Sequence, residues 1–230
     1  MASDMSWFWS HDIPPDQVDG LATPGFRLIR LSHYGRRFAA VLHQRPGPPR
    51  TAALDLTVAD LATTAGRPVA VTVDTSLPEP RFSLVLERAG ASAVHADLDA
   101  AGVHGLLDGT RRILDLDTYH RGGERRYVVV VEESSTPSLL FTDLTRRRLD
   151  AAMREHGTMP VVVRPAGEDL FAAVAEPAGD RRERRRWHAD LDADGVARKL
   201  HRRGAYPVDL DAVRTDRGVR FTVVVGVRSG

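Results

Sequence analysis

The sequence predicts an α/β repeat protein made of five β-α-β-β (ββαβ-type) units, standing in a ring or a crescent with propeller-like pseudo-five-fold symmetry. Three landmarks carry this prediction, because they recur five times in one order along the chain. They are an aspartate followed by an aliphatic residue, a glycine, and an aromatic residue that opens an apolar run. Repetition at a period of about 20–50 residues is typical of repeat architectures, whose units bury their apolar faces against one another.

The first landmark marks the start of a short helix. The aspartates are Asp12, Asp55, Asp97, Asp143 and Asp190. Two residues after each lies the expected N-cap, where Thr and Asp accept hydrogen bonds from the first helical turn. The five expected N-caps are Pro14, Thr57, Asp99, Thr145 and Asp192. An aliphatic residue four positions further on completes a hydrophobic staple in every unit. Unit one is the irregular copy because it carries Pro14 and Pro15, although proline is tolerated in a first turn.

The second and third landmarks mark the helix end and a pair of strands. A glycine takes positive φ without steric cost and is expected to end each helix; these are Gly25, Gly66, Gly109, Gly157 and Gly204. We expect a strand after each glycine, over residues 28–34, 69–74, 113–119, 160–164 and 207–213. A second strand opens at the aromatic landmarks Phe38, Phe82, Tyr127, Phe171 and Phe221. A third strand precedes each repeated aspartate.

We predict a single domain over residues 1–230, because no segment is long enough to serve as a linker between domains. Its units cover about residues 5–48, 49–90, 91–136, 137–180 and 181–230. Open repeat arrays carry atypical polar caps at their ends. The first and last units here are patterned like the middle ones, which favours a closed ring over an open crescent.

The composition excludes several kinds of site and partner. The net charge is +1, so no overall field attracts nucleic acid or an acidic membrane, and we expect neither as a partner. The absence of cysteine excludes disulfides, thiolate metal sites and a cysteine nucleophile. Lys199 is the only lysine among 32 basic residues, a bias typical of a high-GC, for example actinobacterial, genome. Because residues 1–20 hold no long apolar segment and no other apolar run could span a bilayer, we expect a cytoplasmic protein.

The succession of Trp, two residues, Asp, helix, glycine and an Arg-aromatic strand resembles a known repeat. It is similar to the tandem-repeat domain that precedes the β-lactamase-like catalytic domain of polyglycine hydrolases and is also found in bacterial tandem-repeat proteins. The matching stretches are Trp9 to Asp12 with Arg37 and Phe38, and Trp187 to Asp190 with Arg220 and Phe221. The resemblance covers essentially the whole chain and implies an accessory domain. The S-x-x-K motif of those hydrolases is absent, because Val196 stands three residues before Lys199.

Five such units in a ring also look like the pentein fold, a five-bladed α/β-propeller. The penteins that modify guanidines use a cysteine nucleophile, and this chain has none, so that chemistry is not implied. A pentein that acts by binding remains compatible with the sequence. Fold likeness by itself does not give function.

The repeated aspartates have two interpretations. They could form a ring of carboxylates, or each could anchor its own unit by accepting backbone N–H groups or pairing with a repeated arginine. Those arginines are Arg37, Arg81, Arg126 and Arg220. A residue present in every copy is more often framework than site, so we favour the structural interpretation. Functional residues are then expected where the copies differ.

The strand after each glycine differs most between copies. In units one, three and five its alternate positions are polar, with Arg30 and Ser32, Asp115 and Asp117, and Asp209 and Asp211. In units two and four we interpret Val71, Val73 and Val162 as the equivalent apolar positions. Residues two apart share one face of a strand, so the paired carboxylates are candidates for metal binding or general acid–base work. A solvated sheet face or contacts with Arg30 would explain them as well.

Histidines are the other candidates. Those beside a repeated aspartate, or two residues before one, are His11, His95 and His188, and three such units could bring imidazoles and carboxylates together near the axis. That spacing is not specific, and we expect no metal and no cofactor. His33 with Tyr34, and Tyr119 with His120, occupy comparable strand ends and are the best acid–base candidates near a ring mouth. Ordinary residues flanking a turn are the alternative.

A basic run at residues 181–187 (RRERRRW) could bind phosphates, with its tryptophan stacked on a base. In a chain that is nearly neutral overall, we expect a solvated junction between units four and five instead. The tryptophans Trp9 and Trp187 hold similar places in their units, so we expect them to pack in the core or between units.

Two functions remain open. The first is a non-catalytic binding or scaffold domain that holds a peptide, a protein or a small ligand at the ring mouth, with Arg30, His11, His95 and His188 as binding candidates. The second is a small bacterial enzyme of specialised metabolism with acid–base, hydrolytic or cyclising chemistry. Its candidate residues are His33, Tyr34, Asp115, Asp117, Tyr119, His120, Asp209 and Asp211. The absence of any nucleophile motif favours the first, whereas the second requires the histidines to converge with the aspartates in one pocket.

Overall fold

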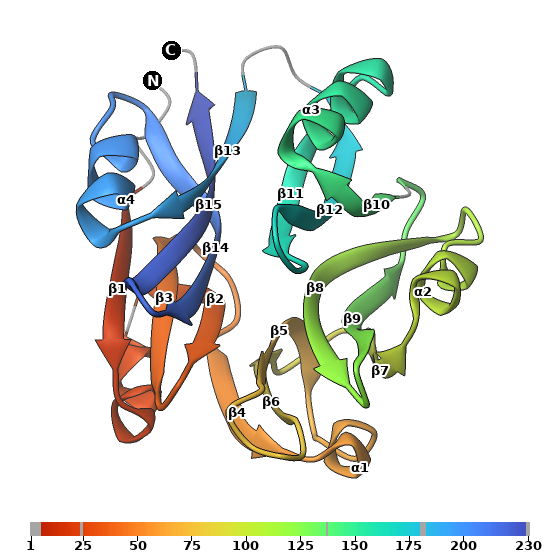
Figure 1. Ribbon diagram of the computed structural model, residues 1–230. Coiled ribbons are helices and arrows are strands. Elements are labelled where there is room, and N and C mark those ends of the chain that lie inside the picture. Colours follow the sequence, from red (N-terminus) through yellow and green to blue (C-terminus); the bar gives the residue numbers. More distant parts are fainter. Residues whose placement is uncertain (1–5, 24, 137, 180–182, 229–230) are drawn as a thin grey trace.

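The computed structural model describes residues 6–23, 25–136, 138–179 and 183–228. These residues form five three-stranded antiparallel sheets, one for each predicted unit, and Figure 1 shows the sheets standing around a common axis. In each unit the strand that carries the aromatic landmark lies in the middle of the sheet, between the strand before the repeated aspartate and the strand after the glycine. The fivefold repetition is therefore confirmed. Residue 5, the unit junctions at 137 and 180–182, and with them two arginines of the run at 181–187, lie outside the described residues.

The three strands of a unit occupy three positions relative to the axis. The first, or outer, strands are β1 (Trp7–Ile13), β4 (Arg50–Leu56), β7 (Ala93–Leu98), β10 (Leu139–Thr145) and β13 (Glu183–Leu191). The second, or inner, strands are β2 (Phe26–Tyr34), β5 (Arg67–Asp74), β8 (Arg111–Arg121), β11 (Thr158–Pro165) and β14 (Ala205–Thr215). The middle strands are β3 (Arg37–Gln44), β6 (Arg81–Glu87), β9 (Glu124–Glu133), β12 (Leu170–Pro177) and β15 (Gly218–Arg228). Each inner strand contains the range predicted after its glycine.

Short helices connect the outer to the inner strand in four units. They are α1 (Val58–Leu61), α2 (Ala100–Leu106), α3 (Arg146–Glu155) and α4 (Ala193–Leu200). Each begins at its predicted N-cap, and Thr57, Asp99 and Asp192 accept a hydrogen bond from the first turn. Unit one has only two 3₁₀ turns, Pro15–Gln17 and Asp19–Leu21, because Pro14 offers no side chain to cap a helix.

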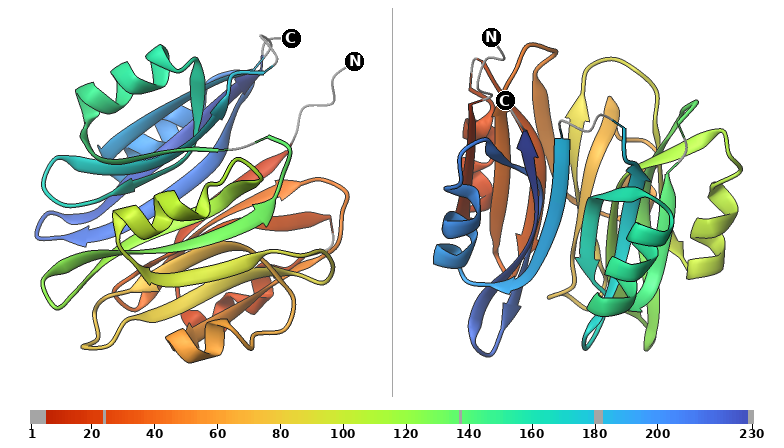
Figure 2. Two further views of the ribbon diagram at one scale, coloured as in Figure 1. Left: turned by 90° about the vertical axis from the view of Figure 1, so that its right-hand side faces the viewer. Right: turned by 90° about the horizontal axis from the view of Figure 1, so that it is seen from above.

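The helices lie at the periphery, outside the sheets (Figures 1 and 2). The molecule is therefore mostly β-sheet, and the predicted α/β class overstates its helical part. No helix in the described part of the chain is long and apolar enough to cross a membrane.

The repeated aspartates make the same backbone turn in every outer strand. All five have positive φ, between 56° and 62°, and the pairing of the outer with the middle strand shifts its register at each of them. This left-handed conformation costs most residues about 1–2 kcal/mol, whereas Asp and Asn adopt it more readily because their short side chains bond locally. The aspartate thus accommodates an irregularity of the outer strand, and the next residue pairs with the middle strand again.

The side chains of these aspartates are not gathered into a ring of carboxylates. They stand on separate outer strands, and each lies near an arginine side chain. Asp12, Asp55 and Asp190 lie 3.6–3.9 Å from the predicted arginines Arg37, Arg81 and Arg220. Asp97 and Asp143 pair instead with Arg121 and Arg125, not with Arg126. Exposed ion pairs contribute little, so the main contribution of the aspartates is their backbone conformation, which the sequence interpretation did not include.

Each pair of neighbouring units meets at what we call a seam, and every seam has its own apolar cluster. Four seams join units consecutive in the chain. The fifth joins unit five to unit one, where Leu210, Phe221 and Val223 pack with Ala39 and Val41. Each inner strand contacts the inner strands of both neighbours, and these contacts return from β14 to β2. The contacts therefore pass through all five units and come back to the first.

No strand pairing crosses a seam in the described part of the chain, so the inner strands present open edges to one another and form no barrel. Buried backbone N–H groups need acceptors, and side chains of the neighbouring unit supply them. One such bond per seam is His33 N to Thr72 Oγ1 (2.9 Å), Val71 N to Asp115 Oδ2 (2.9 Å), Ile113 N to Ser138 Oγ (3.1 Å), Val163 N to Asp209 Oδ2 (3.2 Å) and Ala212 N to Ser32 Oγ (2.8 Å).

The left-handed turn predicts how a repeated aspartate responds to substitution. Asp55→Val should lower the free energy of unfolding by about 1–2 kcal/mol, because a β-branched residue is poorly accommodated at positive φ. Asp55→Asn should change it by less than about 0.5 kcal/mol, because asparagine tolerates the same φ. Urea unfolding followed by fluorescence measures both. Equal losses in the two variants would show that the charge of Asp55, and not its backbone conformation, is what matters.

Candidate functional site

Six charged side chains occupy the space between the inner strands, and we call them the axial network. They are Arg30, Asp115, Asp117, Arg164, Asp209 and Asp211, and none is more than 8% exposed. They come from β2, β8, β11 and β14. Buried charges are stable only when they are paired and hydrogen-bonded, so the contacts of each group decide what the site can do.

A bulge in every inner strand places these residues on the axis. The register with the middle strand shifts between Leu28 and Arg30 in unit one and at the equivalent position in each other unit. The equivalents of Arg30 and Ser32 in unit two are therefore Ala70 and Thr72. The sequence interpretation of Val71 and Val73 as axial positions is wrong, because the bulge displaces the alternation by one residue.

The axial positions of unit four are also more polar than the sequence predicted. Val162 is equivalent to Arg30, as predicted, since both follow the bulge. Two residues later, however, comes Arg164, which is 2% exposed and charged. Unit four is thus polar on the axis, and its arginine is the counter-charge of the aspartates in units three and five.

Arg164 is the centre of the axial network. Its Nη1 donates to Asp209 Oδ2 at 2.6 Å and its Nη2 to Asp115 Oδ1 at 3.0 Å. Burial alone lowers the pKa of a guanidinium, but the surrounding aspartates outweigh it and raise the pKa of Arg164 well above its usual value. Arg30 closes the other side, because its Nε donates to Asp209 Oδ1 at 3.0 Å and its Nη2 to Leu114 O at 3.1 Å.

The network has four aspartates and only two arginines, and burial raises the pKa of Asp115 as well as those of Asp117 and Asp211. The arginines donate hydrogen bonds to Asp115 and Asp209, whereas Asp117 lies 4.0 Å from Arg164 Nε and Asp211 has no ion pair with a described residue, so the shortage of positive charge is greatest at Asp117 and Asp211. Burial, and then the neighbouring Asp211, raises the pKa of Asp117 to about 7. Burial likewise raises the pKa of Asp211. Asp117 accepts hydrogen bonds from the backbone N–H of Val73 and Thr118. Asp211 Oδ1 accepts one from Ser32 Oγ at 2.9 Å, whereas its Oδ2 accepts none from any described residue.

A cavity lies at each end of the axis. The one at the carboxyl ends of the inner strands, which we call the acidic mouth, has a volume of about 810 Å³ and includes Asp74, Asp117 and Asp211 in its lining. The one at the amino ends, which we call the basic mouth, has a volume of about 750 Å³ and a lining rich in arginine. Arg30 belongs to the lining of the basic mouth and Asp117 to that of the acidic mouth, so the axial network stands between them.

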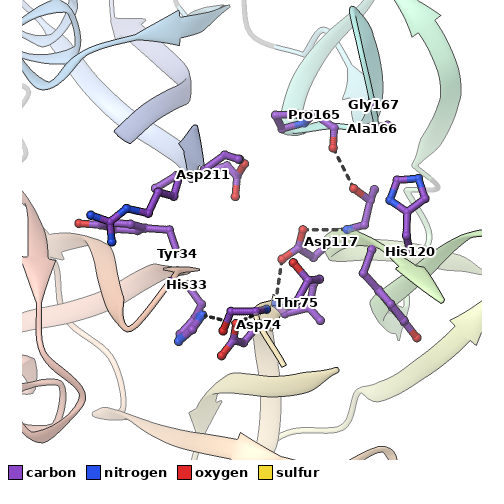
Figure 3. Close-up of a pocket in the computed structure, with 18 residues that line it drawn as sticks. His33, Tyr34, Asp74, Thr75, Asp117, His120, Pro165, Ala166, Gly167 and Asp211 are labelled. Atoms are coloured by element: carbon purple, nitrogen blue, oxygen red, sulfur yellow. Dashed lines mark hydrogen bonds and ion pairs between the residues drawn. The ribbon is translucent and has the colours of Figure 1, made fainter. Parts of the chain in front are cut away.

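The acidic mouth gathers most of the acid–base candidates. Figure 3 shows the carboxyl groups of Asp117 and Asp211 directed toward the middle of the cavity, with His33, Asp74 and His120 around them. His33 Nδ1 lies 3.5 Å from Asp74 Oδ1. Burial lowers the pKa of His33, with Asp74 acting in the opposite direction.

Two candidates at this mouth have structural partners. The hydroxyl oxygen of Tyr34 accepts a hydrogen bond from the backbone N–H of Asp12 at 2.6 Å, and that of Tyr119 accepts one from Asp97 N at 2.9 Å. The tyrosines thereby support the left-handed turn of two repeated aspartates. Burial raises the pKa of Tyr119 to about 12, so its hydroxyl stays protonated at neutral pH.

The other histidine candidates lie away from both mouths. His11, His95 and His188 stand on the outer strands β1, β7 and β13 of three different sheets, and neither cavity includes them in its lining. His11 stacks on Trp9 and meets the edge of Phe221. The structure therefore does not bring these three imidazoles together with Asp115 or Asp209. Among the described residues, no group of three or more His, Asp or Glu side chains is placed to hold a metal ion.

Ion pairs link the units around the basic mouth. Glu87, Glu132 and Glu176 occupy equivalent positions near the ends of three middle strands. The chain of contacts runs from Arg27 to Glu87, Arg67, Glu132, Arg112, Glu176, Arg185 and Glu183. It starts in unit one and ends in unit five, so each unit takes part.

Sequence reasoning missed three features of these sites. Thr72 was missed because the bulge changes which residues of β5 face the axis. Arg164 was missed because an arginine at the end of a short apolar strand is not unusual. The basic mouth was missed because its arginines come from separate units. One signal was present in the sequence: Glu87, Glu132 and Glu176 each stand two residues after a valine of the middle strand. Trp187, the last residue of the basic run, donates a hydrogen bond to Asp150 and packs on Phe171, as expected for a tryptophan between units.

The position of Arg164 predicts a large loss of stability when it is removed. Arg164→Met should lower the free energy of unfolding by about 3–5 kcal/mol, because it leaves Asp115 and Asp209 buried without their central partner. The loss should be smaller at pH 5 than at pH 8, since the buried aspartates can then take up protons. Urea unfolding measures it, and Arg198→Met on an exposed face of α4 is the control. A loss no larger than that of the control would contradict the structural role of the network.

The raised pKa of Asp117 predicts how stability depends on pH. A folded-state pKa above the unfolded value stabilises the protein at low pH, and this contribution disappears as the pH rises through about 7. Asp117→Asn removes the titration, so the variant should gain stability relative to the original chain between pH 5 and pH 8. Unfolding midpoints of both proteins across this range give the difference. A difference that does not change with pH would show that Asp117 is already ionised at pH 5.

Comparison with known proteins assigns no family to this arrangement. No protein-family model matches the chain, and no curated protein matches it. The resemblances to the repeat domain of polyglycine hydrolases and to penteins stay predictions from the sequence pattern. The function must therefore be argued from the two mouths themselves.

Proposed function

We propose that the chain is a non-catalytic binding domain that holds a small cationic ligand in the acidic mouth. One observation carries this proposal: the axial network is short of positive charge, and the shortage lies at Asp117 and Asp211, which line that mouth. A cation bound there supplies the missing counter-charge. It also gives Asp211 Oδ2 a hydrogen-bond donor.

The size of the cavity fits such a ligand. Small-molecule sites have volumes of about 300–1,000 Å³ and combine apolar walls with a few polar groups that orient the ligand. The acidic mouth falls in this range, at about 810 Å³, and Val73, Pro165 and Ala166 contribute to its walls. An amine or a guanidinium in this cavity would have the carboxylates of Asp74, Asp117 and Asp211 around it. A lysine or arginine side chain of a peptide offers the same chemistry.

The architecture that we propose for this domain is a closed, propeller-like ring of pseudo-five-fold symmetry, of the kind found in penteins. It is supported by the five seams and by the return of inner-strand contacts from β14 to β2. Such a ring presents two mouths at opposite ends of its axis. On the sequence evidence we place its work in the bacterial cytoplasm.

Binding in the acidic mouth should be coupled to the release of a proton. Without ligand, a proton on Asp117 relieves the crowding of the carboxylates, and a bound cation displaces it. The affinity for putrescine, used as a probe, should fall about fivefold from pH 7 to pH 6 and level off above about pH 8. Isothermal titration calorimetry in buffers of different ionisation enthalpy measures the affinity and the protons released.

Matched variants test whether the site is the one proposed. Asp211→Asn should weaken putrescine binding at least about tenfold, because it removes a charge-assisted contact. Asp216→Asn is the control, since this exposed aspartate lies in the turn between β14 and β15 and does not line the cavity. The neutral analogue 1,4-butanediol should not bind. If no small amine or guanidine binds, or if Asp211→Asn leaves binding unchanged, the proposal is wrong.

An enzyme at the same mouth is the second candidate, and a specific observation favours it. Asp117, with a pKa of about 7, shares a cavity with His33 and His120, which suits proton transfer near neutral pH. Against it, Tyr34 and Tyr119 are engaged in the framework, and His11, His95 and His188 lie elsewhere. Mass spectrometry of a ligand recovered after prolonged incubation separates the two candidates. If the original chain alters the ligand chemically and the Asp117→Asn variant does not, the protein is an enzyme.

A further inference from the structure

The basic mouth carries far more positive than negative charge. Among the described residues, eight arginines line it, against three glutamates. The chain as a whole has a net charge of only +1. The excess is thus concentrated in one concave surface, where low-dielectric walls strengthen its field.

The glutamates of this mouth do not neutralise its arginines one by one. Glu87 alone pairs with Arg27, Arg50 and Arg67. Arg50 donates two hydrogen bonds to Glu87 Oε1, at 2.8 Å from Nε and 2.7 Å from Nη2. Because Arg67 also pairs with Glu132, these three guanidinium groups share two carboxylates, and this side of the mouth keeps an excess of positive charge after every internal pair is formed.

Two further arginines of the lining have no carboxylate partner among the described residues. Arg45, just after β3 in unit one, makes no hydrogen bond and no ion pair there. Arg228, at the end of β15 in unit five, lies over the ring of Tyr206, 5.2 Å from its centroid. Arg45 comes from unit one and Arg228 from unit five, and both line the same cavity. Guanidinium groups in this state are donors available to a ligand.

In the lining of this cavity, side chains of units one and five are held by hydrogen bonds and ring contacts. His43 is 4% exposed, its Nε2 lies 2.6 Å from Pro207 O, and its ring meets the edge of Tyr206. The hydroxyl of Tyr206 donates to Glu183 Oε1 at 2.6 Å. Burial lowers the pKa of His43 to about 4, and Arg45, Arg30 and Arg50 add to that shift. The imidazole therefore experiences the positive potential of the mouth.

We infer that the basic mouth is a binding site for a small oxyanion with two or more phosphate or carboxylate groups, held over the seam between units five and one. Arg45 and Arg228 would contact it directly, while Arg27 and Arg50 contribute their charge from the wall. Planar guanidinium forks match the geometry of both kinds of oxyanion. This site is at the other end of the axis from the acidic mouth and does not depend on the function proposed there.

A compact ligand fits this mouth better than a nucleic-acid strand does. A strand requires a groove of basic residues that follows its backbone over several nucleotides. Here the arginines face into one cavity of about 750 Å³, and Glu87, Glu176 and Glu183 in its lining interrupt the positive surface. Closely spaced charges on one small molecule match that arrangement.

The test uses inorganic pyrophosphate and citrate as probes, with the full chain, in isothermal titration calorimetry. Both probes should bind, and the affinity should fall as the salt concentration rises. Inorganic phosphate, which carries one group, should bind at least about tenfold more weakly. Binding of pyrophosphate alone identifies a phosphate ligand, and binding of citrate alone identifies a carboxylate ligand. If neither binds at millimolar concentration, the inference is overturned.

Paired variants locate the site. Arg45→Gln with Arg228→Gln should weaken binding roughly a hundredfold, because each charge-assisted bond contributes about a factor of ten. Arg147→Gln with Arg148→Gln removes the same charge from the exposed face of α3 and should change it less than about twofold. Equal losses in the two double variants would show a nonspecific effect of net charge and would overturn the inference.

A second measurement does not depend on the variants. The pKa of His43, followed by NMR, should rise when pyrophosphate binds, because the anion offsets the potential of the arginines around it. His188, whose pKa is also about 4, stands on the outer strand β13 and serves as the internal reference, so its pKa should stay unchanged. Binding that leaves the pKa of His43 unchanged would place the anion elsewhere.

Discussion

The structure depends on how the open edges of the inner strands are satisfied. Each sheet ends at the axis in a strand whose outward N–H groups find no partner in its own sheet. The neighbouring unit supplies a side-chain oxygen at every seam: Thr72, Asp115, Ser138, Asp209 and Ser32. Backbone pairing would have fused the sheets into a barrel. Side-chain pairing keeps them separate and requires polar residues in the centre of the molecule.

The charged centre follows from that requirement. Aspartate can accept several hydrogen bonds, so it completes an edge well, but each one adds a buried negative charge that must be balanced. Arg164 and Arg30 balance Asp115 and Asp209. Nothing in the network balances Asp117 and Asp211 to the same degree. The axis is consequently acidic at one end, while the arginines that link the units make the other end basic, although the whole chain is nearly neutral.

The parts of this fold that sequence could predict are those set by local chemistry. Thr57, Asp99 and Asp192 stand out as N-caps because capping acts within one helical turn, and the five glycines before the inner strands all have positive φ. The repeated aspartate was visible, but its left-handed conformation was not, since a residue type does not reveal φ. The bulge before Ala70 was also hidden, because the alternation of residues 69–73 reads equally well in either register.

The candidate site was predicted only where the sequence showed an anomaly. Asp117 and Asp211 stood out as charges on an apolar strand, and both line the acidic mouth. Arg164 did not stand out, since an arginine at the end of a short apolar strand is ordinary. Arg164 neutralises Asp115 and Asp209, which are far from it in the sequence and close to it in space. Arg45 and Arg228 likewise form one surface only because units one and five are neighbours.

Closing a seam by side chains has a consequence for how duplicated copies can change. Backbone hydrogen bonding between the sheets would require the same strand geometry in each unit. A seam requires only a side-chain oxygen within hydrogen-bond distance of the neighbouring unit's N–H group. Threonine, serine and aspartate all meet that demand here, four times from an inner strand and once, at Ser138, from the residue before an outer strand. Each unit can therefore carry a different pair of axial residues while the seams keep their hydrogen bonds. Such differences are coupled by charge across units, because Arg164 of unit four is the partner of Asp115 in unit three and of Asp209 in unit five.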